Sequence, residues 1–296
     1  MKKANSDFII KDRVYDIGKD IDGKMKTTAD LHPVILSIVL EIDRVCRKNN
    51  IPYALGFGSA LGINNYAGFI PWDDDADIAI DYFDIPRLID AFKKDLGDNF
   101  TFDCYETDER YNVLVPTMKV KRKDTYLKEK NWFTLPDRIH SCDGFFVDIV
   151  AFIGMINDEE HIKFLKRSKR RMLPYVICDA IFRIDPKRLK RKIKAEEKEA
   201  AIKYKDAPYV CQTPIIPWQP AAGNLLPRDV IFPFREYDFE GHKLFSFNKV
   251  EQFCILHYGP RSVKYFDGEK YVDRQPEKYR KVGHINAFSL DRPKIK

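Results

Sequence analysis

The sequence predicts an α+β fold, in which a mixed sheet is flanked by helices and followed by a helical and irregular C-terminal half. Three features lead to this prediction. Apolar residues recur at helical spacing over residues 31–46, short runs rich in β-branched and aromatic residues lie between residues 54 and 155, and the chain beyond residue 207 is rich in proline and aromatic residues. With 296 residues, 44% of them hydrophobic, the chain is long enough to bury a substantial core.

The pattern divides the chain into three parts. Residues 1–30 are polar and weakly patterned, and we expect an irregular N-terminal arm there. Residues 31–155 hold the core, and residues 156–296 hold a basic helical segment and a C-terminal region that covers the core. The N-terminus lacks the apolar stretch of a secretory signal, and the longest apolar run, residues 34–40, is too short to span a bilayer. We therefore expect a cytoplasmic protein.

The first elements of the core follow from their patterns. An amphipathic helix begins at Leu31, with Asp30 as its N-cap, and ends at "NNIP". "YALGFGSALG" is typical of a short strand that turns through small residues into a helix start, and "ADIAI" alternates as a strand does. "DIPRLIDAFKKDLGDN" predicts a second helix, capped by Asp84 and closed by Gly97.

Three further strands complete the predicted core, at "FTFDCYE", "LVPTMKVKRK" and "GFFVDIVAF". Strands of mixed spacing beside helices indicate an α+β or α/β domain that ends near residue 155. The segment that follows looks helical, with breaks at Pro174 and Pro186. Near the C-terminus, "FNKVEQFCILHYGP" predicts a helix with an apolar face of Val250, Phe253, Cys254 and Leu256.

Positive charge is concentrated in the basic segment, residues 161–205. The whole chain has a net charge of +6, yet this segment alone has sixteen Lys and Arg against five Asp and Glu. It is either a pair of solvated helices or a contact surface for an anionic partner, such as a membrane, a phosphorylated polymer or nucleic acid. The six cysteines contain no Cys-x-x-Cys pair, which argues against a zinc site built from such pairs and gives no disulfide framework.

The densest chemical signal is "GFIPWDDDADIAID", residues 68–81. Asp75 and Asp77 are separated by one residue, so on a strand their side chains share a face, and their mutual repulsion favours a cation between them. Oxygen ligands alone favour a hard ion such as Mg²⁺ or Mn²⁺. Asp148, flanked by apolar residues in "FFVDIV", is the natural third ligand, because an aspartate in a buried strand is costly unless it is paired or binds a metal.

Simpler explanations exist for each of these features. "DDDAD" alone is more typical of a solvated turn, and Asp148 alone is as consistent with a structural role. An EF-hand loop starting at Asp73 fails because Ile78 stands where glycine is needed and Asp84 where glutamate is usual.

A second feature lies upstream of the aspartates. Gly58 and Ser59, at a helix start, could present N–H groups and a hydroxyl to a phosphate, or could simply allow close packing. The combination of Gly-Ser, then Asp-x-Asp about sixteen residues later, then a further strand aspartate is the pattern of the nucleotidyltransferase fold.

Here the sequence resembles a known family. "GFGSALGINNYAGFIPWDDDADIAI" is similar to the signature of the LicD family, which also includes the fukutin-related proteins. The resemblance continues through "MKVKRKDT" and "GFFVDIV" to "FEGHKLFSFNKVEQFCILHYG" and covers most of residues 31–260. It implies a nucleotidyltransferase-like catalytic core at residues 31–155. Members are metal-dependent phosphotransferases that move a phospho-alcohol, phosphocholine being the best-known case, from a cytidine diphosphate (CDP) donor to a glycan hydroxyl, releasing cytidine monophosphate (CMP).

The resemblance also implies roles for individual residues. Asp75 and Asp77 would hold the metal ions, and Asp148 would be the third carboxylate, placed to accept the proton of the incoming hydroxyl. Gly58 and Ser59 would cradle the donor phosphate.

Two lysines and three departures complete the comparison with the family pattern. Lys119 and Lys121 share one strand face and are candidates to hold phosphate, although exposed strand lysines are the commoner case. Asn65 stands where the family usually has a basic residue. Ala151 and Ile153 stand where it tends to have proline and aspartate. The predicted carboxylate triad is intact, so we expect activity.

Three functions follow from these observations. The leading hypothesis is phosphotransfer from a CDP-alcohol to a glycan or lipid-linked glycan, with the basic segment in peripheral contact with the inner membrane face and no nucleic-acid partner. The first alternative is an RNA nucleotidyltransferase of the same fold, for which the basic segment would be the RNA footprint. The second is a non-catalytic protein that holds a cation for structure.

Overall fold

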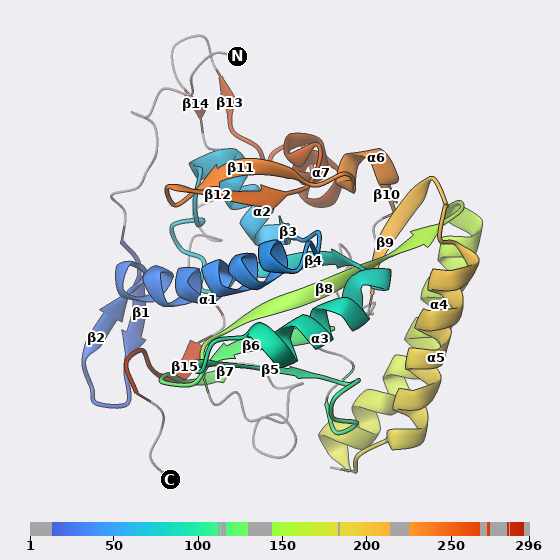
Figure 1. The fold of residues 1–296 in the computed structure, drawn as a ribbon, viewed down its shortest axis with the longest axis horizontal. Coiled ribbons are helices and arrows are strands. Elements are labelled where there is room, and N and C mark those ends of the chain that lie inside the picture. The colour runs from blue at the N-terminus through green and yellow to red at the C-terminus, as the bar shows by residue number, and fades with distance from the viewer. Residues whose placement is uncertain are drawn as a thin grey trace.

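A nine-stranded mixed sheet forms the centre of the protein in the computed structural model (Figure 1). The model describes residues 14–111, 113, 117–129, 144–182, 184–213, 225–266, 271–272, 283 and 285–292. The strands of this sheet are β3 (Ala54–Gly56), β4 (Asp77–Asp81), β5 (Phe100–Cys104), β6 (Met118–Arg122), β8 (Phe146–Met155), β9 (Tyr209–Thr213), β10 (Leu226–Pro227), β11 (Arg235–Phe239) and β12 (His242–Ser246).

The long strand β8 organises this sheet. On one side it pairs in parallel with β4, which continues to β3, β12 and β11. On its other side, its first half pairs with β6 and then β5, and its second half pairs with β9 and then β10. The mixed sheet flanked by helices confirms the predicted α+β class, and strands of the C-terminal half extend the sheet as well as covering the core.

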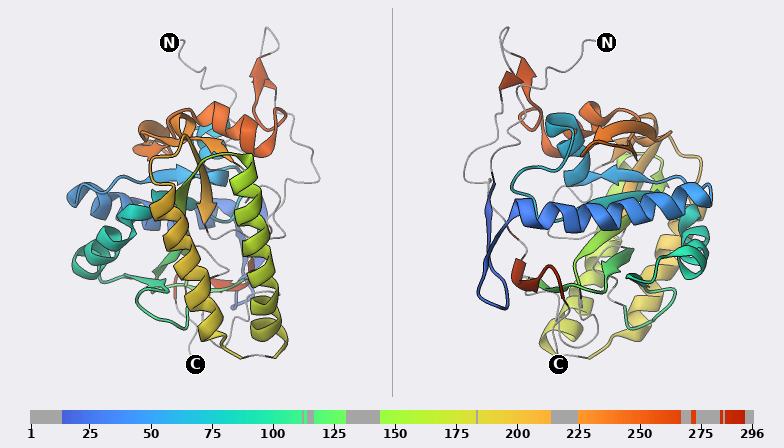
Figure 2. Two further views of the ribbon diagram at one scale, coloured as in Figure 1. Left: turned by 90° about the vertical axis from the view of Figure 1, so that its right-hand side faces the viewer. Right: turned by 60° about the vertical axis from the view of Figure 1, so that its left-hand side comes forward.

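Helices surround the sheet. They are α1 (Thr28–Lys48), α2 (Phe57–Tyr66), α3 (Ile85–Asp95), α4 (Asp158–Val176), α5 (Lys187–Lys203), α6 (Arg228–Ile231) and α7 (Val250–Tyr258), with the short turns η2 (Tyr82–Asp84) and the π-helical η3 (Ile177–Ile181). Helix α1 contacts α3, β6 and β8, α2 packs on α7, and α4 and α5 form a hairpin along one flank (Figures 1 and 2). Among the described residues no helix has the length and apolar character needed to cross a membrane.

In the part of the chain that the structure describes, three smaller pairings lie outside the main sheet. They are β1 (Asp16–Lys19) with β2 (Met25–Thr27), β7 (Tyr126–Glu129) with β15 (Ile285–Ser289), and β13 (Tyr265–Phe266) with β14 (Tyr271–Val272). The first pairing corrects the expectation of an irregular arm for the described part of residues 1–30. The Asp20 carboxylate accepts backbone hydrogen bonds from Asp22 and Lys24, both at 2.9 Å, and these bonds fix the turn.

The helix ends differ from the sequence expectations in physical detail. The N-cap of helix α1 is Thr27, not Asp30. Asp30 occupies the N3 position of a capping box, and its carboxylate accepts the Thr27 N–H at 2.8 Å. Helix α3 follows Asp84 as expected but ends at Asp95, two residues before Gly97. In α7, Leu256 lies outside the apolar face and is 45% exposed. The buried residues of this helix are Val250, Phe253 and Cys254, and Ile255 packs against the core beside them.

Pro174 does not break its helix, which contradicts the sequence expectation. Helix α4 continues through it to Val176 and then into η3. A proline removes one helical hydrogen bond, and here the burial of Met172 and Tyr175 against Ile193 of α5 holds the helix in place. Pro186, by contrast, lies at the start of α5 as expected.

The partly buried His257 predicts an acid-sensitive contribution to stability. Its ring stacks on Phe253 with centroids 5.1 Å apart, and burial lowers its pKa to about 4 from the ordinary 6.5. Between these two pH values the unfolded chain binds a proton that the folded chain does not, so the free energy of unfolding falls as the pH falls, by up to about 3 kcal/mol. Urea unfolding of the wild type and His257→Phe at both ends of this window measures the effect. An acid loss of equal size in the variant would contradict it.

Candidate active site

The two central aspartates lie directly opposite each other on neighbouring strands. Asp77 of β4 pairs in register with Asp148 of β8, and the same row continues to Lys119 of β6 and Asp103 of β5. Side chains of directly paired residues point to the same face of a sheet. The structure therefore brings Asp77 and Asp148 together on one face, although they are far apart in the sequence.

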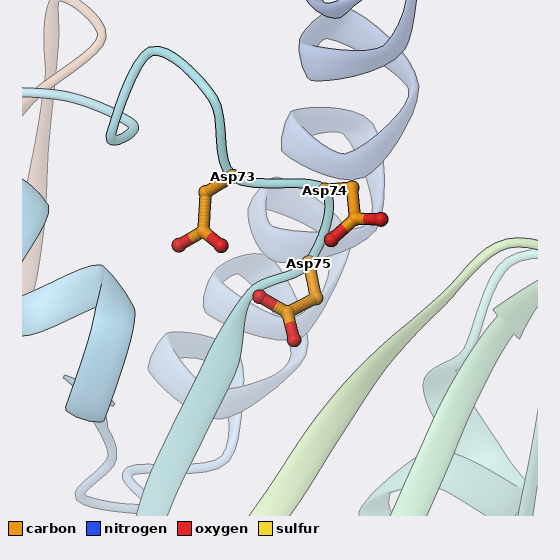
Figure 3. Close-up of side chains that lie close together, drawn as sticks. All are labelled: Asp73, Asp74 and Asp75. Atoms are coloured by element: carbon orange, nitrogen blue, oxygen red, sulfur yellow. The ribbon is translucent and has the colours of Figure 1, made fainter. Parts of the chain in front are cut away.

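Asp75 reaches the same region from a loop rather than from a strand. Strand β4 starts at Asp77, so Asp75 belongs to the segment that leads into it, with Asp73 and Asp74 (Figure 3). These three residues each offer a carboxylate oxygen within 4.8 Å of the others. Sequence reasoning placed Asp73 only in a rejected EF-hand and did not single out Asp74. An Ile70–Asp73 turn, closed by a 2.9 Å backbone hydrogen bond, precedes this cluster.

Gly58 and Ser59 bring the first turn of α2 to the aspartates. The Ser59 hydroxyl accepts the Asp77 backbone N–H at 3.1 Å. A Cβ at Gly58 would lie 3.1 Å from Oδ2 of Asp73, so glycine allows helix and carboxylate to approach closely. Because the N-terminus of a helix carries a partial positive charge, this arrangement also stabilises negative charge near it.

Lys119 and Lys121 are buried, unlike ordinary strand lysines. The Lys119 ammonium lies 2.8 Å from Oδ1 of Asp148 and 3.3 Å from the centroid of the Phe146 ring, and only 4% of the residue is exposed. Lys121 forms an ion pair with Asp103 at 2.5 Å. Both lysines are thus held by carboxylates on the sheet, and Lys119 fixes the carboxylate of Asp148.

The aspartate loop is anchored from the β11–β12 turn. Glu240 accepts the Phe69 backbone N–H at 2.9 Å, and its own N–H donates to the Ala67 carbonyl at 3.0 Å. A Cβ at Gly68 would lie 2.0 Å from the Glu240 carboxylate, so a larger residue there would displace the Glu240 side chain. These two hydrogen bonds hold the "AGF" segment (residues 67–69) against the "FEG" segment (residues 239–241).

Helix α1 supports the loop from the other side. His32 stacks on Phe69 with centroids 4.4 Å apart, and its Nε2 lies 2.9 Å from the carbonyl oxygen of Asp73. Burial lowers the pKa of His32, and the Asp73 carbonyl and nearby carboxylates oppose that shift only in part. A mainly neutral imidazole can donate to this carbonyl and fix the start of the aspartate cluster.

Tyr258, at the end of α7, is a site residue that sequence reasoning missed. Burial of its hydroxyl, with the charges of Asp77, Asp73 and Asp75, raises the pKa of Tyr258 well above its ordinary value. The residue is still 41% exposed, so solvent reaches part of the side chain. Its place in a predicted amphipathic helix gave no signal of this role, because only the fold brings α7 to the aspartates.

The three departures from the family pattern have clear places in the structure. Asn65 lies at the end of α2, and the Lys264 ammonium lies 2.8 Å from its carbonyl oxygen and 3.7 Å from the ring centroid of Tyr66. A cation from elsewhere in the chain therefore lies beside this position. Ala151 and Ile153 are both buried in β8.

Comparison with known proteins agrees with this geometry. Residues 50–141 match the family model described as LicD/FKTN/FKRP, nucleotidyltransferase domain. Residues 50–141 are thus similar to the nucleotidyltransferase domain of that family. The matched range includes Gly58, Ser59, Asp75, Asp77 and both lysines, and ends before Asp148.

A relative with an assigned activity gives further support to the LicD family. The chain is 25% identical over 149 residues to the lipopolysaccharide cholinephosphotransferase LicD of Haemophilus influenzae. That similarity covers 50% of this chain and 53% of the relative, so the chain spans about half the length of the curated protein it matches.

Close packing of α2 on the aspartate loop gives a first test. A Cβ at Gly62 would lie 2.3 Å from the carbonyl oxygen of Gly68. Gly62→Ala should therefore lower the free energy of unfolding by about 1–3 kcal/mol, measured by urea unfolding. Gly283→Ala is the matched control, because a Cβ there meets nothing within 4 Å. Equal stabilities for the two variants would show that the helix does not rest on the loop.

The ion pair between Lys119 and Asp148 gives a second test. Lys119→Gln leaves Asp148 without its ammonium partner on the sheet and should lower the free energy of unfolding by about 3 kcal/mol. The control is Lys123→Gln, whose ammonium contacts an exposed carbonyl, with an expected change within about 0.5 kcal/mol. Both values come from denaturant unfolding. A Lys119 effect as small as that of the control would exclude a structural role for the pair.

Proposed function

We propose that the protein is a metal-dependent phosphotransferase that moves a phosphocholine-like phospho-alcohol from a CDP-activated donor to a hydroxyl of a glycan or lipid-linked glycan, releasing CMP. The observation that carries this proposal is the direct pairing of Asp77 with Asp148, with Asp75 on the loop beside them. The name of the LicD relative supports phosphocholine as the transferred group. The protein would act in the cytoplasm at the inner membrane face.

The site residues fit a hard divalent cation. Carboxylates from two neighbouring strands and one loop offer only oxygen ligands, which Mg²⁺ and Mn²⁺ prefer. Asp75, Asp77 and Asp148 would hold the ion, with Asp73 and Asp74 adding negative charge nearby. Such an ion supplies neutralisation of the diphosphate charge and alignment of the donor.

The chain's own groups would orient both substrates. The first turn of α2, with Gly58 and Ser59, lies against the aspartates and would receive donor phosphate at its N–H groups. Asp148, held in position by Lys119, would accept the proton of the incoming glycan hydroxyl. Lys119 would thereby position Asp148 toward the acceptor. The buried Lys121 would neutralise Asp103, the next carboxylate in the same row of the sheet.

A donor panel tests the proposed reaction. The full chain is incubated with Mg²⁺, a glycan acceptor and a series of CDP-alcohols, and CMP release is measured. We expect release from CDP-choline or a related CDP-alcohol and none after chelation of the metal. Extension of RNA with nucleotide triphosphates, with no turnover of any CDP-alcohol, would favour the RNA nucleotidyltransferase instead.

Asp77→Asn separates catalysis from a structural ion. A catalytic role predicts a loss of CMP release of roughly a hundredfold or more, with a nearly unchanged melting temperature, because the amide removes a charged ligand but keeps the shape. Asp238→Asn, on an exposed position of β11, is the control and should leave both quantities unchanged. A large fall in melting temperature with Asp77→Asn would instead indicate that the cation serves structure.

A further inference from the structure

The end of α4 and the turn between α4 and α5 present four large apolar side chains to solvent. Leu173, Ile181, Phe182 and Ile184 are between 61% and 68% exposed, and together they form what we call the apolar tip. The turn lies at the end of the hairpin away from the β8–β9 junction and projects beyond the sheet (Figures 1 and 2). Scattered apolar residues are normal on a protein surface, but a cluster on one protruding turn indicates a contact surface.

The hairpin beneath the tip is firmly docked on the core. Met172 and Tyr175 are buried against Ile193 and Val113. The Lys190 ammonium, fully buried, pairs with Asp185 at 2.9 Å and donates to the Arg110 carbonyl at 2.9 Å. The exposure of the tip is therefore not a consequence of a loosely packed hairpin.

The backbone of the turn is also ordered by hydrogen bonds. The Phe182 N–H donates to the Ile177 carbonyl at 3.2 Å, and the Ile184 N–H donates to the Cys178 carbonyl at 2.9 Å. The first bond has the π-helical spacing of η3, and the second ties the following residues of the turn back to η3.

Exposed basic residues lie next to the apolar tip. Arg170 lies on α4 one turn before Leu173, and Lys187 and Arg188 begin α5 just after Ile184. Asp185, which lies between Ile184 and Lys187 in the sequence, is paired with Lys190. Apolar side chains on a protruding turn with cations beside them match the interface of an anionic bilayer, where the apolar groups enter the acyl boundary and the cations contact headgroups.

We propose that the apolar tip, with Arg170, Lys187 and Arg188, docks the protein on a bilayer that contains anionic lipids. The inference deepens the proposed function, because an acceptor carried on a lipid would then be met at the membrane surface. The test of this inference does not depend on the proposed reaction, since vesicle binding is measured with neither donor nor acceptor. Charge complementarity favours a lipid surface over a second protein, which the test includes as an outcome.

Co-sedimentation of the full chain with vesicles tests the proposal. We expect binding to vesicles of phosphatidylcholine mixed with phosphatidylglycerol, and much weaker binding to phosphatidylcholine alone. The double variant Ile181→Asp, Phe182→Asp should reduce binding by at least about tenfold. Lys187→Glu and Arg188→Glu should each reduce it by about fivefold or more, with a weaker effect at high salt.

Ile202→Asp is the matched control. Ile202 is 60% exposed on the same hairpin but lies near its opposite end, so its variant should bind as the wild type does. Circular dichroism checks that the tip variants stay folded. We expect them to fold because the substituted residues are exposed. Absence of wild-type binding to the anionic vesicles, or equal losses in tip and control variants, would overturn the proposal. Self-association that depends on the tip, without vesicle binding, would identify a contact between copies instead and would also overturn it.

Discussion

The parallel pairing of β4 with β8 is the constraint on which the candidate site depends. It sets Asp77 directly opposite Asp148 on one face of the sheet, and two carboxylates in such positions repel each other. Lys119 compensates the charge of one of them from the neighbouring strand. The row still holds an excess of negative charge, and Asp73, Asp74 and Asp75 add to it. A fold that accepts such repulsion is typical of a functional site, because stability alone does not favour it.

The elements around the site hold these carboxylates in place from several parts of the chain. Helix α2 bonds to the start of β4 through Ser59, and helix α1 supports the loop through His32. Glu240, from the β11–β12 turn, fixes the loop three residues after α2 ends. The loop is therefore held by contacts on both sides before any ligand binds. Such preorganisation reduces the cost of ordering the site around a substrate.

Local patterns in the sequence were enough to predict much of this arrangement. The alternation in "ADIAI" and the apolar neighbours of Asp148 predicted strands and carboxylates that share a face, and both strands were confirmed. Their register could not be predicted, because nothing local in either strand specifies its partner. For the same reason Tyr258 and Glu240 were missed, since only long-range folding brings them near the aspartate region. Pro174 was misjudged because tertiary packing outweighed its local cost.

Composition also could not tell which basic residues of the segment 161–205 have a structural role and which remain exposed for a partner. Lys190 is buried, and Lys194 bonds to Glu106 and Glu197, both at 3.1 Å. Although burial acts to lower it, the pKa of Lys194 is raised by these two carboxylates. These lysines fasten α5 to the β5–β6 connection and cannot also serve a polymer. The positive field that remains for a partner comes from the exposed residues, and at the turn of the hairpin these lie beside apolar side chains. A nucleic acid would gain little from such apolar neighbours, whereas a lipid surface uses both.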